Sequence, residues 1–145
     1  MSRIRRTRGG YRLRLPASER ELLRALPAQL RDLLETGDPA LERLFPPAYP
    51  DDPERDREYR DLARADLIDG RRSALDIVEE TIDADHLDEE QLEAWMRSLN
   101  DLRLVLGTRL GITEETADHA EKEPFALYLY LGWLLEQIVE ALAGE

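Results

Sequence analysis

The sequence predicts an all-α fold: a single-domain helical bundle of four long helices and one or two short ones, with a short N-terminal extended strand or arm. Apolar residues recur at spacings of three and four along most of the chain, which is the helical period. Only 8 of the 145 residues are glycine, and the chain is long enough for one core. We therefore expect a flexible basic arm over 1–9 and one helical domain over 10–145.

The N-terminal segment alternates in polarity. Tyr11, Leu13 and Leu15 are separated by Arg12 and Arg14, a pattern typical of a short strand with one apolar face. A lone strand has no hydrogen-bonding partner, so it must pair with another segment or with a second copy of the chain.

The first predicted helix follows this strand. Ser18 and Glu21 form a capping-box pattern at its start, and Gly37 stops it. Pro27 lies within it and should kink or restart the helix, because proline lacks an amide donor. A short helix is expected over 38–44, beginning at the Asp-Pro pair.

A proline-rich loop over 45–53 comes next, with Phe45 and Tyr49 expected to dock against the helices. The following helix should run from Glu54 to Ile82. Its predicted buried side consists of Tyr59, Leu62, Ala63, Leu67, Leu75 and Val78.

The second half of the chain predicts two long helices. Asp88 and Gln91 resemble a second capping box, placed in an acidic turn before a central helix over 89–110. Thr113 could cap a short turn through residue 120, and Pro124 suits the first turn of a last helix that reaches Leu142.

The polar residues of the central helix are its candidate binding site. Asn100, Arg103 and Gly107 share a stripe displaced from the leucine face. Asp101 and Arg109 also lie among the apolar residues of this helix, so they too must find hydrogen bonds or reach water. Arg103 and Arg109 either pair with carboxylates of a neighbouring helix, such as Glu58 or Asp61, or line a partner-binding groove in which Gly107 permits close approach. The spacing favours the structural interpretation.

The last helix is apolar on more than one face, so it either occupies the centre of the bundle or offers an interface. Its Tyr128, Tyr130 and Trp133 suit a protein interface, because they bury large areas and keep a polar group. Burial within the monomer and contact in a homodimer are equally expected.

Charge is divided unevenly. The formal net charge is −12, yet residues 1–14 contain six arginines and no acid. The remaining 14 basic residues face 32 acidic ones, so residues 15–145 carry about −18, a field that repels phosphate. DNA contact is therefore expected only through the arm, with Arg3, Arg5, Arg6 and Arg8 as its candidate residues.

Catalytic and metal-binding patterns are weak. The chain has no cysteine, hence no disulfide, thiolate nucleophile or cysteine-ligated metal. A calcium loop starting at Asp83 fails, because Leu87, Asp88 and Ala94 occupy its fifth, glycine and closing-glutamate positions. A solvated acidic turn is the favoured interpretation.

Other reactive arrangements are no stronger. Glu115 and His119 stand four apart but lack further convergent ligands, since His86 lies in another segment. A glycine-rich phosphate loop and a nucleophile elbow are both missing from the sequence. We expect no enzyme activity, no metal and no cofactor.

Hydropathy predicts no membrane span. The longest apolar stretch, 125–135, has eleven residues, against the ~18 or more that a span requires. The basic N-terminus is not followed by the apolar segment of a signal peptide, so a cytoplasmic protein is expected.

Two segments carry a family resemblance. LFPPAYPDD at 44–52, with EYR at 58–60, and WMRSLNDLRLVLGTRLGI at 95–112 resemble an actinobacterial family first described as a domain of unknown function. The resemblance extends from YRLRL at 11–15 to the C-terminal helix. Some members, the AosR-like proteins, are described as oxidative-stress transcriptional regulators. They are associated with redox sensing through a cysteine pair, which this cysteine-free chain lacks.

The resemblance implies transcription regulation. The leading hypothesis is a non-catalytic regulatory protein that acts through protein-protein contacts, with a sigma factor or RNA polymerase as partner, because an acidic body suits a basic surface. One alternative is a direct DNA-binding regulator that uses the arginine arm. Another is an adaptor in proteolysis, because relatives are often encoded near a proteolytic adaptor. An enzyme or metal protein built on His86, His119 and carboxylates is the remaining alternative.

Overall fold

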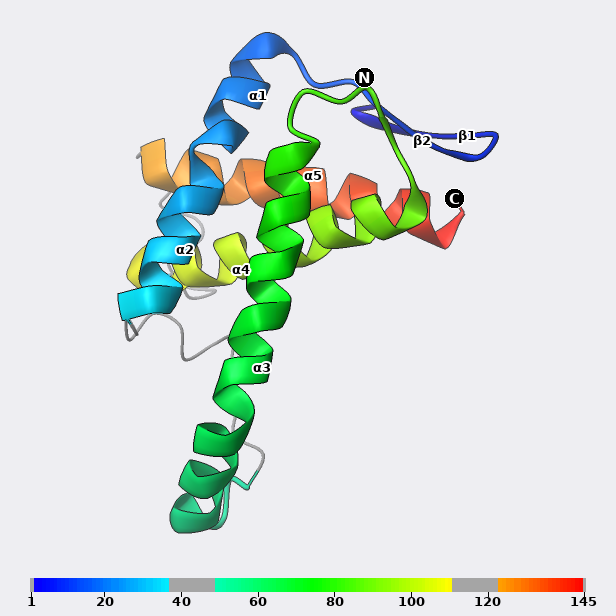
Figure 1. Ribbon diagram of the computed structural model, residues 1–145. Helices are drawn as coiled ribbons and strands as arrows, with labels where there is room; N and C mark the ends of the chain where they lie inside the picture. The colour runs from blue at the N-terminus through cyan, green and yellow to red at the C-terminus, as the bar shows by residue number, and fades with distance from the viewer. Residues whose placement is uncertain (1, 37–48, 111–122, 145) are drawn as a thin grey trace.

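The computed structural model describes residues 2–36, 49–110 and 123–144, and these are mostly helical, as predicted (Figure 1). Five helices and a small antiparallel sheet of three strands make up the described residues. The elements in chain order are β1 (Ile4–Thr7), β2 (Gly10–Leu13), α1 (Ala17–Arg24), α2 (Leu26–Thr36), α3 (Pro53–Glu80), β3 (His86–Leu87), α4 (Glu89–Leu110) and α5 (Glu123–Ala143).

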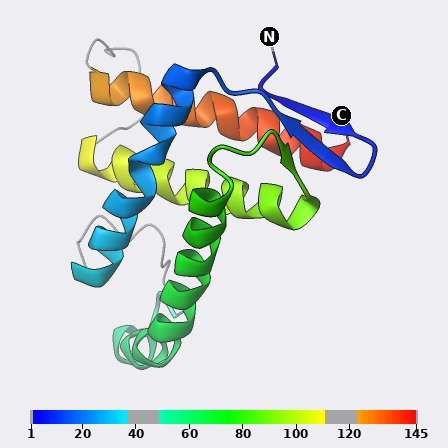
Figure 2. The ribbon, with the colours of Figure 1, turned by 45° about the horizontal axis from the view of Figure 1, so that its top comes forward.

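Helices α4 and α5 lie side by side and antiparallel, and α3 crosses them steeply, as both ribbon views show (Figures 1 and 2). The sheet covers the end of this pair where α5 finishes. The main core joins α4, α5, the sheet and α1 around Trp95, which is fully buried. A second cluster of Leu30, Leu34, Leu75 and Val105 joins α2, α3 and α4. The fold is therefore held together mainly by apolar packing on α4.

The basic segment expected to be a flexible arm contributes a strand. Residues 4–7 form β1, which pairs with β2 through the register Ile4↔Leu13 and Arg6↔Tyr11. Gly9 has φ +88°, a left-handed conformation that suits glycine in a tight turn. The segment is ordered because Ile4 is buried beside Leu13 in the core, and the turn lets the chain return on itself.

The third strand also explains a glycine. β3 pairs with β2 on its other side, with Tyr11↔Leu87 and Arg12↔His86 opposite each other. A Cβ at Gly10 would lie 2.7 Å from the carbonyl oxygen of Leu87, so a larger residue would push β3 away. The strand predicted over 11–15 thus finds two partners within its own chain.

The predicted helix starts and the predicted interruption at Pro27 are partly confirmed by the structure. Pro27 does restart the first helix: α1 ends at Arg24 and α2 begins at Leu26. The capping box at Asp88 is confirmed, because its amide donates to Gln91 Oε1 at 2.9 Å and its carboxylate accepts from the Gln91 amide at 2.7 Å. The Ser18 capping box is wrong, since α1 begins at Ala17 with Pro16 as N-cap and no side-chain cap.

The buried side predicted for α3 is correct only in its second half. Leu75 and Val78 are buried, but Tyr59, Leu62 and Leu67 are 46%, 83% and 38% exposed. The reason is that the first half of α3 projects beyond the bundle, where α4 and α5 no longer cover it (Figure 1). The predicted helix over 38–44, Phe45 and the turn over 113–120 lie outside the described residues.

One described helix, α5, is long and apolar enough over Ala126–Ala143 to cross a membrane by length and composition alone. The uninterrupted apolar stretch considered from the sequence, over 125–135, is shorter than the segment Ala126–Ala143. The same helix supplies Leu131, Leu134 and Ile138 to the core, all at most 1% exposed. A core helix passes the same test, so this is weak evidence of a span.

Candidate macromolecular interaction surfaces

The N-terminal strand, α1 and α5 meet in a seam of polar contacts. Arg3 forms an ion pair with Glu19 at 2.8 Å, and the Tyr130 hydroxyl donates to the same carboxylate at 2.7 Å. The Arg3 guanidinium lies over the Trp133 ring, 5.2 Å from its centre. Gln137 Oε1 accepts from the Arg3 amide at 2.7 Å. These bonds attach the start of the chain to α5.

The seam shifts the titration of its members in directions that strengthen it. Hydrogen bonding from Arg3 lowers the pKa of Glu19, against the effect of partial burial. Burial, and then the bond to Glu19, raise the pKa of Tyr130, so its hydroxyl stays a donor. Tyr130, one of the predicted partner-binding residues, therefore has a structural partner already.

Next to the seam, and sharing Trp133 with it, α5 presents an outer face of exposed residues. Leu129 is 55% exposed, Trp133 41% and Val139 47%. Glu136 and Glu140 are exposed on the same side, since they follow Trp133 at helical spacings of three and seven. We call Leu129, Trp133, Glu136, Val139 and Glu140 the α5 outer face. Of the predicted interface residues, Trp133 is the one it contains.

Arg103 and Tyr128 serve the contact between α4 and α5. The Arg103 guanidinium lies over the Tyr128 ring, 4.7 Å from its centre. A Cβ at Gly132 would be 3.0 Å from Arg103 Nε, so it is this glycine, on α5, that allows the close approach. Gly107, assigned that role from sequence, is buried. Within the described residues, Arg103 makes no ion pair with Glu58 or Asp61.

The predicted stripe on α4 is thus divided between two sides of the helix. Asn100 is exposed and borders a cleft of about 380 Å³ between α3 and α4, whereas Arg103 faces α5. The side chain of Arg109 lies outside the described residues. The structure therefore does not assemble Asn100, Arg103 and Gly107 into one groove.

The cleft between α3 and α4 holds an ion pair between the buried Asp101 and the partly buried Arg71, a partner that the sequence did not predict. Asp101 is 7% exposed and lies 3.4 Å from Arg71 Nε. Burial raises its pKa to about 6, although the charge of Arg71 acts in the opposite direction. The sequence had placed Asp101 among the apolar residues of this helix, and the structure shows that Ser98 and Val105, three residues before it and four after it, are buried as well.

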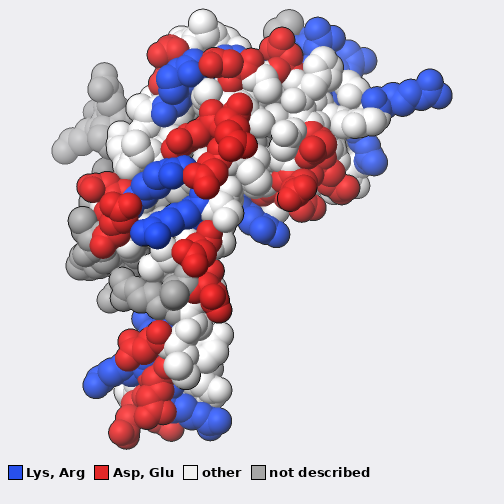
Figure 3. All heavy atoms as spheres, in the orientation of Figure 1, with Lys and Arg blue, Asp and Glu red and all other residues white. Residues whose placement is uncertain are grey.

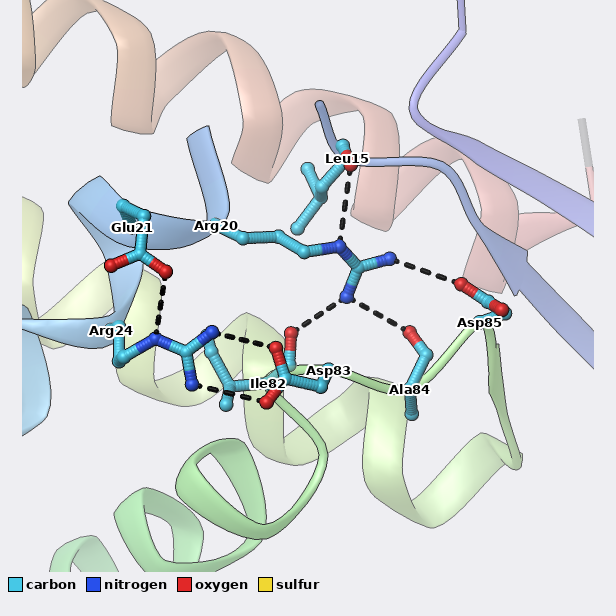
Figure 4. A network of polar contacts seen from close by, with 8 residues as sticks. All are labelled: Leu15, Arg20, Glu21, Arg24, Ile82, Asp83, Ala84 and Asp85. Atoms are coloured by element: carbon cyan, nitrogen blue, oxygen red, sulfur yellow. Dashed lines mark hydrogen bonds and ion pairs between the residues drawn. The ribbon is translucent and has the colours of Figure 1, made fainter. Parts of the chain in front are cut away.

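The acidic turn before α4 is held by two arginines of α1 (Figure 4). Arg20 donates to the carbonyl oxygens of Leu15, Ile82 and Ala84, at 3.3, 2.6 and 3.1 Å. It also pairs with Asp85, as Figure 4 shows.

Arg24 completes this arrangement. It donates to both oxygens of Asp83, at 2.6 and 3.1 Å, and to Glu21 at 3.2 Å. Asp83 and Asp85, two of the carboxylates in the suspected metal loop, therefore have arginine partners. Within the described residues no three potential ligands gather around a metal position, and His86 is exposed on β3. Glu115 and His119 lie outside the described residues.

The arginines of the predicted arm fall into two groups. Arg3 is bound in the seam, and Arg6 lies at the C-terminal end of α5, where its Nη1 would be 2.6 Å from a Cβ at Gly144. A cation suits that position because the helix dipole is negative there. Arg5 and Arg8 are exposed and form no ion pair among the described residues.

Comparison with known proteins places the chain in a family. The model for the domain of unknown function DUF2017 matches residues 1–142. The chain belongs to the DUF2017 family. Oxidative stress regulator AosR of Mycobacterium tuberculosis and that of Mycobacterium bovis are each 33% identical to it over 131 residues, 75% of this chain and 60% of the relative.

A putative oxidative stress regulator AosR of Mycobacterium leprae is similar, at 33% identity over 127 residues, 72% of this chain and 58% of the relative. The DUF2017 chain spans about three-fifths of the length of these curated relatives. The family resemblance inferred from its motifs is confirmed. No solved structure matches the chain.

Proposed function

We propose that this DUF2017 protein is a non-catalytic regulator of the oxidative-stress response that acts by binding a protein partner of the transcription machinery. The observation that carries the proposal is its 33% identity over three-quarters of its length to relatives named oxidative stress regulators. Because this chain has no cysteine, its part in such regulation is contact with a partner and not thiol oxidation.

The α5 outer face is the proposed contact surface. Leu129 and Trp133 lie one helical turn apart and stay exposed, whereas Leu131, Leu134 and Ile138 of the same helix enter the core. Exposed aromatic and aliphatic residues close together are typical of interface centres. The only charged side chains of α5 within Ala126–Ala143 are Glu136 and Glu140, both acidic. The matching partner surface is therefore apolar with a basic rim.

A sigma factor or RNA polymerase is the proposed partner, because an acidic surface of this kind favours a basic one and attracts it over distance. The net charge of −18 over residues 15–145 acts in the same direction. Such an attraction weakens as salt rises, whereas the apolar contact persists.

Binding of the purified protein to purified sigma factors and core polymerase at low salt tests the proposal. Replacing Leu129 and Val139 by lysine removes apolar area and introduces the wrong charge, so we expect at least a tenfold loss of affinity. Leu62→Lys is the control, because Leu62 is 83% exposed on the projecting half of α3. No association with either protein, or an equal loss in the control, would refute the proposal. Binding to a purified protease component in the same assay, without binding to these two proteins, would favour the adaptor alternative.

A further inference from the structure

The exposed face of the N-terminal sheet carries a row of basic side chains across its three strands. Arg5 on β1 lies directly opposite Arg12 on β2, and Arg12 lies directly opposite His86 on β3. All three are exposed, while Ile4, Tyr11 and Leu13 fill the other face. The alternation of the strands therefore gathers these residues on the solvent side.

Two further arginines extend the row. Arg14 follows Arg12 by two residues, so it continues the same side of the chain, and Arg8 stands in the turn between β1 and β2. Figure 3 shows basic side chains projecting from this end of the molecule, at the right of the view. We call Arg5, Arg8, Arg12 and Arg14 the hairpin arginines.

The hairpin arginines form no ion pair among the described residues, although the chain has 32 acidic residues. By contrast, Arg3, Arg20, Arg24 and Arg31 each have a carboxylate partner. Like charges directly opposite each other weaken a strand pair. The Arg5–Arg12 pair thus opposes the stability of a small sheet that holds the start of the chain.

A depression beside this row is suited to an anion. It measures about 330 Å³ and lies between the N-terminal strands and the start of α1. Arg12 and Arg14 border it, and its single carboxylate, Asp85, is already paired with Arg20. An anionic group placed there meets the guanidinium groups of Arg12 and Arg14, which make no ion pair or hydrogen bond with the residues that the structure describes.

We propose that the hairpin arginines bind the phosphodiester backbone of double-stranded DNA without reading its sequence. Guanidinium groups bind phosphate oxygens in a paired, planar geometry, and a strand presents them at regular intervals. Duplex is favoured over single strands because Tyr11, the aromatic residue of the hairpin, is buried and offers no stacking surface. The acidic remainder of the chain repels phosphate, so the proposed contact is confined to the hairpin arginines.

The test is fluorescence anisotropy of a labelled DNA duplex, titrated with the full chain at several salt concentrations. Four phosphate contacts predict a slope of about −3.6 for the logarithm of affinity against that of salt. Arg5→Gln with Arg12→Gln should reduce the slope by about 1.8. Because Arg5 and Arg12 are exposed and repel each other, this variant should not have a lower midpoint of unfolding than the unsubstituted protein.

The matched control is Arg57→Gln with Arg97→Gln, which removes the same charge from exposed positions on α3 and α4. It should leave both affinity and slope unchanged. The inference is overturned if no saturable DNA binding is seen at low salt, if the control loses as much as the hairpin variant, or if the protein binds anionic phosphatidylglycerol vesicles and not DNA. It is also overturned if the hairpin variant unfolds more easily. None of these outcomes depends on the sigma-factor assay.

Discussion

Replacing Asp101 with asparagine should stabilise the protein at neutral pH. The carboxyl group is buried between α3 and α4, and its pKa in the folded protein rises from 3.8 to about 6. Each pKa unit corresponds to about 1.4 kcal/mol, so the ionised form opposes folding by up to about 3 kcal/mol. The nearby charge of Arg71 is already included in that shift, as a smaller and opposite effect.

The direction of the Asp101 pKa shift determines the pH range over which stability changes. The folded pKa is higher than the unfolded one, so the unfolded chain loses this proton first as pH rises. Stability contributed by this group is fully present below about pH 4 and is lost between about pH 4 and about pH 6. Asparagine cannot ionise and escapes this loss.

Urea unfolding followed by circular dichroism at about pH 4.5 and about pH 7.5 measures the effect. The advantage of Asp101→Asn over the unsubstituted protein should grow by 1–3 kcal/mol, in order of magnitude, between these two values. Asp66→Asn, an exposed change on the same cleft, controls for the lost negative charge. If Asp101→Asn is less stable at the higher pH, the ion pair with Arg71 outweighs desolvation and the reasoning fails.

Two further predictions concern the core. Thr81→Val should cost about 1–3 kcal/mol of unfolding free energy, because the buried indole N–H of Trp95 donates to the Thr81 hydroxyl at 2.7 Å and would lose its acceptor. Thr108→Val is the control, because the Thr108 hydroxyl donates to the Leu104 carbonyl and accepts no hydrogen bond from the residues that the structure describes; an equal cost there would contradict this account. Leu75→Ala should cost about 2–5 kcal/mol in urea unfolding, because Leu75 is fully buried. Leu62→Ala should change stability by less than about 0.5 kcal/mol; a larger loss would mean that the projecting half of α3 is covered.

Helix limits could be predicted because their signals are local. The α4 helix matches the predicted range of 89–110, and its start depends on a reciprocal bond between residues three apart. The restart at Pro27 has the same local origin, a missing amide donor. The capping box predicted at Ser18 did not form because helical hydrogen bonding begins earlier, at the Pro16 carbonyl, which accepts from the amides of Glu19 and Arg20.

The candidate site was harder to predict, because helical spacing shows which residues share a face but not what that face meets. Arg103 and Asn100 appeared to share one stripe, yet α5 covers the first and the cleft beside α3 exposes the second. The ion pair of Asp101 with Arg71 joins residues thirty positions apart on different helices. No local pattern specifies such a partner.

The sequence by itself determined the helical class, most helix limits, the absence of thiol chemistry and the concentration of arginines at one end. These follow from backbone hydrogen bonding within a few residues and from composition, neither of which needs a tertiary partner. Only the tertiary structure decided that the basic segment is a strand, which of its arginines are neutralised, and which half of α3 is covered. Those outcomes depend on burial and on contacts between distant segments, where a side chain's surroundings, and not its own chemistry, fix its role.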